Sequence, residues 1–176
     1  MNKTLTIKTK LSLKLFLVFG LTFGILILFI NCLFGDKTKL ITLVLESIIF
    51  GSIMSLFFTA LHLNTLNSNG ITELDEKCFK VKQVDVIHKS CSISQLSQLL
   101  KQDNKTHKWK QTVSGTTIKI KTKISPQSWG EIILISILEN QVKIESRPIL
   151  ITTIFDSGKN LINIKKIKDI IEQSNN

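Results

Sequence analysis

Residues 40–63 read LITLVLESIIFGSIMSLFFTALHL, an apolar stretch whose ionisable side chains are Glu46 and the terminal His62. An α-helix rises about 1.5 Å per residue and the apolar core of a bilayer is about 30 Å thick, so roughly 20 apolar residues cross it. A second such stretch, residues 15–34, precedes it and carries no charge. The two stretches predict a transmembrane helical hairpin.

Lysines flank the predicted spans and indicate their orientation. Four precede the first span, two lie in the turn and three follow the second span: Lys3, Lys8, Lys10, Lys14, Lys37, Lys39, Lys77, Lys80 and Lys82. Because lysine-rich ends stay in the cytoplasm, both termini are predicted to be cytoplasmic in an inner-membrane protein. A cleaved signal peptide is the alternative; residues 15–34 are long for its apolar region, no A-x-A site follows, and Asn31 precedes Cys32 where a lipoprotein would usually have a small residue.

Small residues recur every four positions in both spans. They are Gly20 and Gly24 in the first span and Ser47, Gly51, Ser55 and Thr59 in the second. Lipid provides no hydrophobic drive for helices to associate, so small residues that let backbones approach are predicted to form the contact. With a turn near Lys37 and Thr38, the expected facing pairs are Gly20 with Ser55 and Gly24 with Gly51. The alternatives are that this stripe serves dimerisation or binds a helix of another membrane protein.

Glu46 lies inside the second predicted span, near the level of Asn31 in the first. A carboxylate within a membrane is costly and therefore suggests a function. Glu46 is close enough to the outer boundary to reach the interface or to bond with Asn31, and no second acidic residue at depth completes a proton relay. We expect Glu46 to have a structural or partner-contact role.

The remainder predicts a cytoplasmic α+β domain. The basic segment 1–14 precedes the hairpin, residues 64–77 form a polar linker, and residues 78–174 form the domain. Alternation of apolar and polar residues predicts strands, and apolar residues three and four apart predict helices. The expected order is β-α-β-β-β-β-β-α, a two-layer fold with an antiparallel sheet and two helices. The expected segments are residues 79–88, 92–101 (helix), a hairpin in 109–124, then 130–140, 141–147, 149–155 and 161–173 (helix).

The segment SRPILITTIFDSGKNLINIKKI, residues 146–167, resembles an ending shared by small uncharacterised bacterial membrane proteins with two spans. In that ending a Ser-Arg/Lys-Pro segment is followed by a Thr-rich strand and an Asp-x-Gly-Lys-Asn turn before the last helix. The resemblance covers roughly an eighth of the chain and implies a recurring module without a known activity.

Basic residues form the main candidate contacts of the domain. Lys119, Lys121, Lys123, Lys143 and Arg147 are predicted to collect on one sheet face, either as a solvated surface or as a contact for anionic lipid. Gly158 and Lys159 lie before the last helix, where backbone N–H groups favour an anion; the alternative is a turn with Gly158 at positive φ and Asn160 as the N-cap. Arg147 is the one arginine among 23 basic residues, which argues against nucleic-acid binding.

No spacing unites a nucleophile with a base, pairs two carboxylates or clusters metal ligands. The sequence therefore predicts a non-enzymatic protein without metal or cofactor. The leading hypothesis is an inner-membrane anchor whose cytoplasmic domain binds a protein partner or joins a membrane assembly, with the hairpin as docking element or homo-oligomer contact. The alternative is a membrane-tethered domain that binds or senses a small ligand or lipid, for which an apolar cavity between sheet and helices would be expected.

Overall fold

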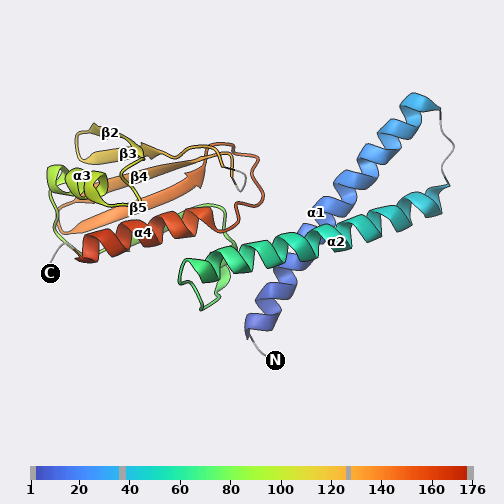
Figure 1. Cartoon of the computed structure of the whole chain (residues 1–176), viewed down its shortest axis with the longest axis horizontal. Helices are drawn as coiled ribbons and strands as arrows, with labels where there is room; N and C mark the ends of the chain where they lie inside the picture. Colours follow the sequence, from blue (N-terminus) through green and yellow to red (C-terminus); the bar gives the residue numbers. More distant parts are fainter. Residues whose placement is uncertain (1–2, 36–38, 126–127, 174–176) are drawn as a thin grey trace. The chain divides into compact units, whose positions relative to one another are not determined.

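A computed structural model of the chain describes residues 3–35, 39–125 and 128–173 and divides into two compact units (Figure 1). Unit 1 is Met1–Asp75 and unit 2 is Glu76–Asn176. The turn predicted near Lys37 and Thr38 and the predicted domain end at residue 174 lie outside the described residues.

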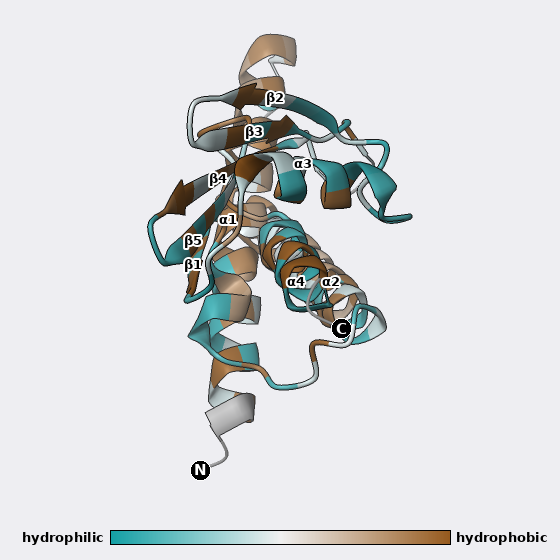
Figure 2. Ribbon diagram, turned by 90° about the vertical axis from the view of Figure 1, so that its left-hand side faces the viewer, coloured by the Kyte–Doolittle hydropathy of each residue, from teal (hydrophilic) through white to brown (hydrophobic). Residues whose placement is uncertain are grey.

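Unit 1 consists of two long helices, α1 (Lys3–Phe34) and α2 (Leu40–Ser68). Both are long and apolar enough to cross a membrane, and Figure 2 shows apolar stretches of α1 in brown. Each helix is longer than its predicted span. The basic segment 1–14 is helical from Lys3 onward, because a run of lysines, leucines and threonines contains no helix-breaking residue.

The end of α2 corrects the predicted linker. Residues 64–68, expected to begin the linker, form the last turn of α2. Gly70 stops the helix: it has φ +72°, its N–H donates to the Asn67 carbonyl at 2.9 Å, and the N–H of Ile71 donates to the Leu66 carbonyl at 3.0 Å. These two hydrogen bonds form a Schellman motif, in which a left-handed glycine satisfies the last carbonyls. The asparagine–glycine pair therefore marks a helix end rather than an open linker.

Unit 2 has the predicted α+β architecture. A five-stranded sheet in the order β1-β5-β4-β3-β2 pairs antiparallel throughout, with two α-helices and a short 3-10 turn. The elements are η1 (Glu76–Phe79), β1 (Gln83–Ile87), α3 (Ile93–Gln102), β2 (Lys110–Ser114), β3 (Thr117–Lys121), β4 (Glu131–Leu138), β5 (Gln141–Pro148) and α4 (Lys159–Gln173). The Ser92 hydroxyl accepts the N–H of Gln95 at 3.2 Å and so caps α3, as its position predicts.

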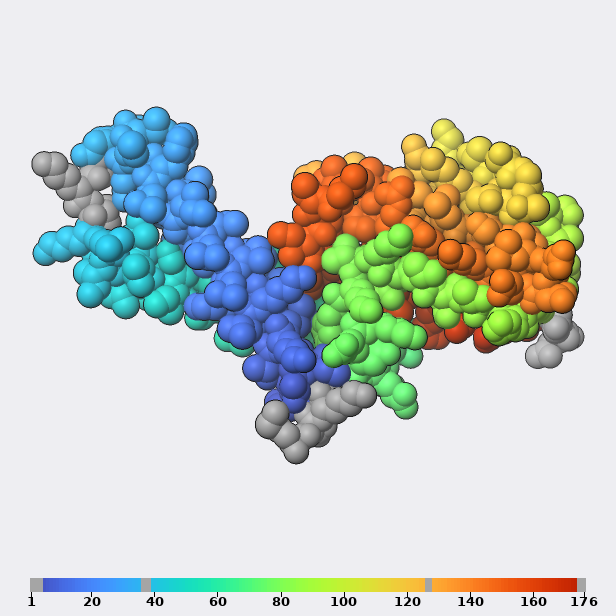
Figure 3. All heavy atoms as spheres, turned by 180° about the vertical axis from the view of Figure 1, so that it is seen from behind, coloured from blue at the N-terminus to red at the C-terminus, as the bar shows by residue number. Residues whose placement is uncertain are grey.

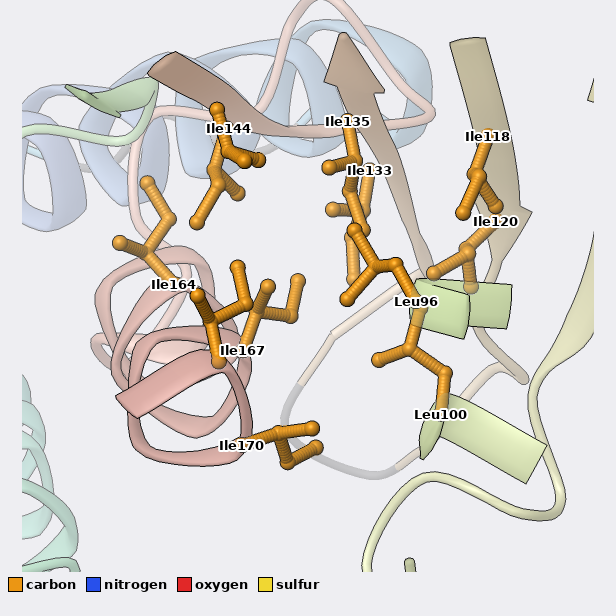
Figure 4. Packing of buried hydrophobic residues seen from close by; sticks show 12 residues of the cluster. Leu96, Leu100, Ile118, Ile120, Ile133, Ile135, Ile144, Ile164, Ile167 and Ile170 are labelled. Carbon is orange, nitrogen blue, oxygen red and sulfur yellow. The ribbon is translucent and has the colours of Figure 1, made fainter. Parts of the chain in front are cut away.

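The core lies on one face of this sheet, beneath α3 and α4. Isoleucines of the central strands point toward Leu96 and Leu100 of α3 and toward three isoleucines of α4 (Figure 4). On α4 the buried residues include Ile162, Ile164, Ile167 and Ile171, whereas Leu161, which was predicted to face inward, is half-buried. The other sheet face carries no helix of unit 2 within the described residues.

The strand predicted for residues 149–155 does not form. The ladder ends where the Ile149 N–H donates to the Gly130 carbonyl at 3.0 Å, and β4 begins at Glu131. None of the described strands therefore lies beside the residues that follow Ile149. Gly130 has φ +86° and turns the chain away from the sheet at that point. Residues 149–155 therefore form turns, with the Thr153 N–H donating to the Leu150 carbonyl at 3.2 Å.

Candidate functional site

The two helices of unit 1 approach each other closely at Gly20 and Gly51. A Cβ placed on Gly51 would come within 3.0 Å of Gly20 Cα and 3.1 Å of the Phe16 carbonyl oxygen. A Cβ on Gly24 would lie 2.8 Å from the Ser47 hydroxyl oxygen. Four of the predicted helix-packing residues thus lie in one close contact between backbones, as small residues allow.

The pairing differs from the predicted one by one helical turn. Gly20 faces Gly51 rather than Ser55, and Gly24 faces Ser47 rather than Gly51. The prediction assumed two straight helices lying side by side up to the turn, but α1 and α2 cross and separate towards it in Figure 1. Ser55 and Thr59 are buried further along α2. The stripe is therefore used within the hairpin.

Glu46 and Asn31 are not brought together. Glu46 is exposed on α2, Asn31 is half-buried on α1, and the described residues show no hydrogen bond between the two side chains. Glu46 follows the start of α2 by less than two turns, which keeps it near the end of the helix.

Four of the five predicted basic residues lie on the open face of the sheet. Side chains alternate between faces along a strand, and the register places Lys121, Ile132 and Arg147 in one row across β3, β4 and β5. The next row contains Lys119, Leu134 and Glu145. We call this surface the basic face and define it by Lys110, Thr112, Lys119, Lys121, Ile132, Leu134, Ser136, Lys143, Glu145 and Arg147.

The charges of the basic face are only partly paired. Glu145 accepts from Lys82 at 3.0 Å, and Arg147 Nε lies 3.9 Å from the same carboxylate oxygen. Lys119, Lys121 and Lys143 have no carboxylate within ion-pair distance among the described residues. Figure 3 shows yellow to orange atoms of the strands at the surface on this side. Ile132 lies half-buried between Lys121 and Arg147, and Leu134 lies half-buried between Lys119 and Glu145.

Lys123 is not part of the basic face. It follows the end of β3 and lines a separate polar cleft together with Lys159 of α4. These two lysines were predicted in different candidate sites, because β3 and α4 meet only in the folded domain.

The turn before α4 holds its own anion. Asp156 is 5% exposed, and its carboxylate accepts the N–H groups of Gly158 at 3.1 Å and Asn160 at 3.0 Å. Gly158 has φ +76°, as predicted for a turn glycine, but the capping side chain is Asp156 rather than Asn160. The amides proposed for an external anion are thus occupied by this carboxylate. An aspartate two residues before a glycine is the signal that could have identified the turn.

Burial raises the pKa of Asp156 above its ordinary value, and the nearby Glu131 charge acts in the same direction. Hydrogen bonds from Asn160 and Gly158 oppose that effect. Asn160 also donates its amide to Asp156 at 2.7 Å and accepts from the Ser146 hydroxyl at 2.6 Å. The cap is therefore tied to β5 by a buried polar network.

Residues 149–155, which do not form the predicted strand, include an exposed apolar segment that was not predicted from the sequence. Ile151 is 93% exposed, and Ile149, Leu150 and Ile154 are exposed as well. Trp129, which is also exposed, lies beside Gly130 at the same end of the sheet. We call this the apolar end: Trp129, Ile149, Leu150, Ile151 and Ile154.

Comparison of the chain with protein-family models, curated proteins and solved structures finds no match. The resemblance of residues 146–167 to two-span bacterial membrane proteins stays a prediction.

Proposed function

We propose that the chain is a non-enzymatic, membrane-anchored docking protein. Its hairpin crosses the inner membrane with both termini in the cytoplasm, and its α+β domain binds an acidic protein partner on the basic face. The observation that carries this proposal is the open sheet face itself, on which basic side chains flank the half-buried Ile132 and Leu134.

This composition matches what protein interfaces require. Interface cores are apolar and their rims polar, and opposite charges on the partner speed association. Ile132 and Leu134 supply the apolar centre, and Lys119, Lys121 and Lys143 supply the rim. We favour a protein over a lipid surface because Ile132 and Leu134, at the centre of the basic face, are half-buried and leave little apolar surface to insert into a bilayer.

Within the proposal, the hairpin is an anchor. Gly20 and Gly51 are already in contact with each other, so their small surfaces are used inside one chain. We therefore assign partner binding to the α+β domain. The proposed role of the hairpin as an anchor is supported by the length and apolar character of its two helices.

A photo-crosslinking residue at Thr112 tests the proposal. Thr112 is exposed on the basic face and pairs with Lys119, whereas Gln98, exposed on α3, provides the control position. In intact membranes we expect one adduct of defined mass from Thr112 and none from Gln98. The double charge reversal Lys119→Glu, Lys121→Glu should reduce the adduct about tenfold or more, and Lys101→Glu on α3 should not. Adducts with lipid alone, or an adduct insensitive to charge reversal, would refute the protein partner.

Orientation has its own test. A reporter that is active only in the cytoplasm, fused after Asn176, should be active, and protease added outside intact cells should leave the domain uncut. Cleavage of the domain from outside would contradict the proposed topology.

A further inference from the structure

A polar cleft of about 240 Å³ opens at the end of unit 2 where β4 begins. Residues of α4 at spacings of three and four form one wall and therefore share one helical face: Lys159, Ile162, Asn163 and Lys166. The other walls come from Glu131, the first residue of β4, and from loops beside β2, β3 and β4: Lys108, Trp109, Thr122, Lys123, Ser125 and Ser128. The cleft thus joins segments that are far apart in the sequence.

Glu131 is a buried carboxylate that is only half-satisfied. It is 4% exposed, yet its Oε1 has no hydrogen-bond partner among the described residues. Its Oε2 accepts from the Thr122 hydroxyl, and the Glu131 N–H donates to the same hydroxyl oxygen at 2.8 Å. This reciprocal pairing holds the side chain in place. A buried oxygen without a donor is costly, so a ligand that supplies one would gain affinity here.

Around this carboxylate the cleft is cationic. The lysines at positions 108, 123, 159 and 166 have no carboxylate within ion-pair distance among the described residues. Burial lowers the pKa of Lys166, and the charges of Lys159 and Lys105 lower it further. Like charges held together in a partly buried site are relieved by a bound anion.

We propose that this cleft binds a small zwitterion, whose anionic group lies among the lysines and whose ammonium donates to Glu131 Oε1. An aminoalkyl phosphate has this chemistry, since lysines bind phosphate as point charges. The volume suits a ligand of that size, because clefts for drug-sized molecules begin at about 300 Å³. Neither the anion nor the ammonium alone would satisfy both parts of the site.

Two sources could supply such a group. Glu131 pairs across the sheet with Pro148, directly before the apolar end. Both the headgroup of an aminophospholipid and a free metabolite of the same chemistry carry a phosphate and a primary ammonium, so the ligand is one of these two.

Trp109 supplies a native reporter for binding. It lines the cleft, and Trp129 is the other tryptophan of the chain. The variant Trp129→Phe, purified as the full chain in nanodiscs of phosphatidylcholine, leaves Trp109 as the fluorescent probe. Choline carries no N–H, so this lipid cannot donate to Glu131.

The first experiment compares the affinities of three ligands for the cleft without any substitution in its lining. We expect phosphoethanolamine to change Trp109 fluorescence with an affinity about tenfold or more above that of ethyl phosphate or ethanolamine, because a charge-assisted hydrogen bond to a buried carboxylate is strong. Equal affinities for phosphoethanolamine and ethyl phosphate would overturn the proposal. So would the absence of binding by phosphoethanolamine at millimolar concentration in both fluorescence and calorimetry.

Two variants test separately the part of the site that would bind the ammonium and the part that would bind the anion. Glu131→Gln should reduce phosphoethanolamine affinity about tenfold and leave ethyl phosphate affinity unchanged. Lys166→Met should weaken both ligands, and Lys101→Met on α3 should weaken neither. Near-ultraviolet circular dichroism checks that each variant is folded. If Glu131→Gln does not fold, the contrast between ligands on the unmodified site still decides the question.

A further experiment with a second lipid distinguishes a headgroup taken from the bilayer from a free metabolite. Nanodiscs with phosphatidylethanolamine in place of part of the phosphatidylcholine should change Trp109 fluorescence without added ligand if the headgroup is taken from the bilayer. A change produced only by soluble phosphoethanolamine would indicate a free metabolite. These outcomes do not depend on the basic face, so this proposal and the proposed protein docking fail independently.

Discussion

The backbones of Gly20 and Gly51 touch: a Cβ on Gly51 would lie 3.0 Å from Gly20 Cα and 3.1 Å from Gly20 N. Such distances are tighter than most Cβ contacts, and neither backbone can rotate away as a side chain could. The contact therefore favours glycine on α2. On α1 the preference for glycine at position 20 is weaker, because a Cβ on Gly20 would lie 3.3 Å from the Ser47 carbonyl oxygen and 3.9 Å from Gly51 Cα.

This asymmetry gives a matched pair of variants. Gly51→Ala should destabilise the hairpin by about 1–3 kcal/mol, the usual cost of forcing extra atoms into a packed contact. Gly20→Ala should cost less than half as much, because only a small adjustment is needed. Titration with sodium dodecyl sulfate, followed by circular dichroism, measures both. Equal effects would mean that the helices do not cross at this pair.

Alanine variants at Gly130 and Gly115 distinguish the cost of backbone strain from the cost of steric crowding. Both have positive φ, +86° and +54°, but a Cβ on Gly130 would lie 3.1 Å from the Thr122 carbonyl oxygen, whereas one on Gly115 would meet nothing within 4 Å. Gly115→Ala should cost about 1 kcal/mol from strain alone. Gly130→Ala should cost more, about 2 kcal/mol or above. Urea unfolding of the two variants gives the comparison, and a smaller loss for Gly130→Ala would contradict the crowded geometry.

Asp156 should contribute more to the free energy of unfolding than an ordinary helix cap does. Its carboxylate accepts three hydrogen bonds, from the N–H groups of Gly158 and Asn160 and from the Asn160 amide. Asp156→Ala should lower the free energy of unfolding by about 2 kcal/mol, at the upper end for caps. The control Asp169→Ala removes an exposed pair with Lys165 and should cost less than about 0.5 kcal/mol. Similar losses for the two would show that the Asp156 network is not formed.

The Asp85–Lys168 ion pair, 2.8 Å long, should make stability depend on pH at both extremes. Burial raises the pKa of Asp85, but the hydrogen bond from Lys168 and the N–H of Val86 outweigh it, and its pKa lies below the ordinary value. The hydrogen bond to Asp85 raises the pKa of Lys168, against burial. The stabilisation by Asp85 is thus present above its unfolded pKa of about 4 and lost as pH falls through the lower folded pKa.

For Lys168 the sign is opposite. Its stabilisation is present below its unfolded pKa of about 10.4 and lost as pH rises through the higher folded value. A double-mutant cycle with Asp85→Asn and Lys168→Met should therefore show coupling between about pH 5 and pH 9 and weaker coupling at about pH 2. The coupling should stay below about 1 kcal/mol, because both side chains are 36% exposed. Unchanged coupling at pH 2 would exclude the ion pair as its source.

Local patterns predicted most elements. The strands in residues 130–140 and 141–147 follow from alternation and from the turn at Glu139 and Asn140, and β4 and β5 occupy these positions. The strand predicted in residues 149–155 failed because the partner strand ends first, a fact that no local pattern contains. The pairing of Gly20 failed for the same kind of reason, since the crossing of two helices is not set by the length of their connection.

The amino-acid sequence alone determined the two apolar helices, the α+β class of the domain and the alternation that places lysines on one sheet face, because these depend on spacing along the chain. Only the tertiary structure decided that Glu131 and the lysines of α4 share a cleft, and that the amides before α4 are filled by Asp156. Those arrangements bring together residues from different elements, and the physical cause is the packing of α4 on the sheet.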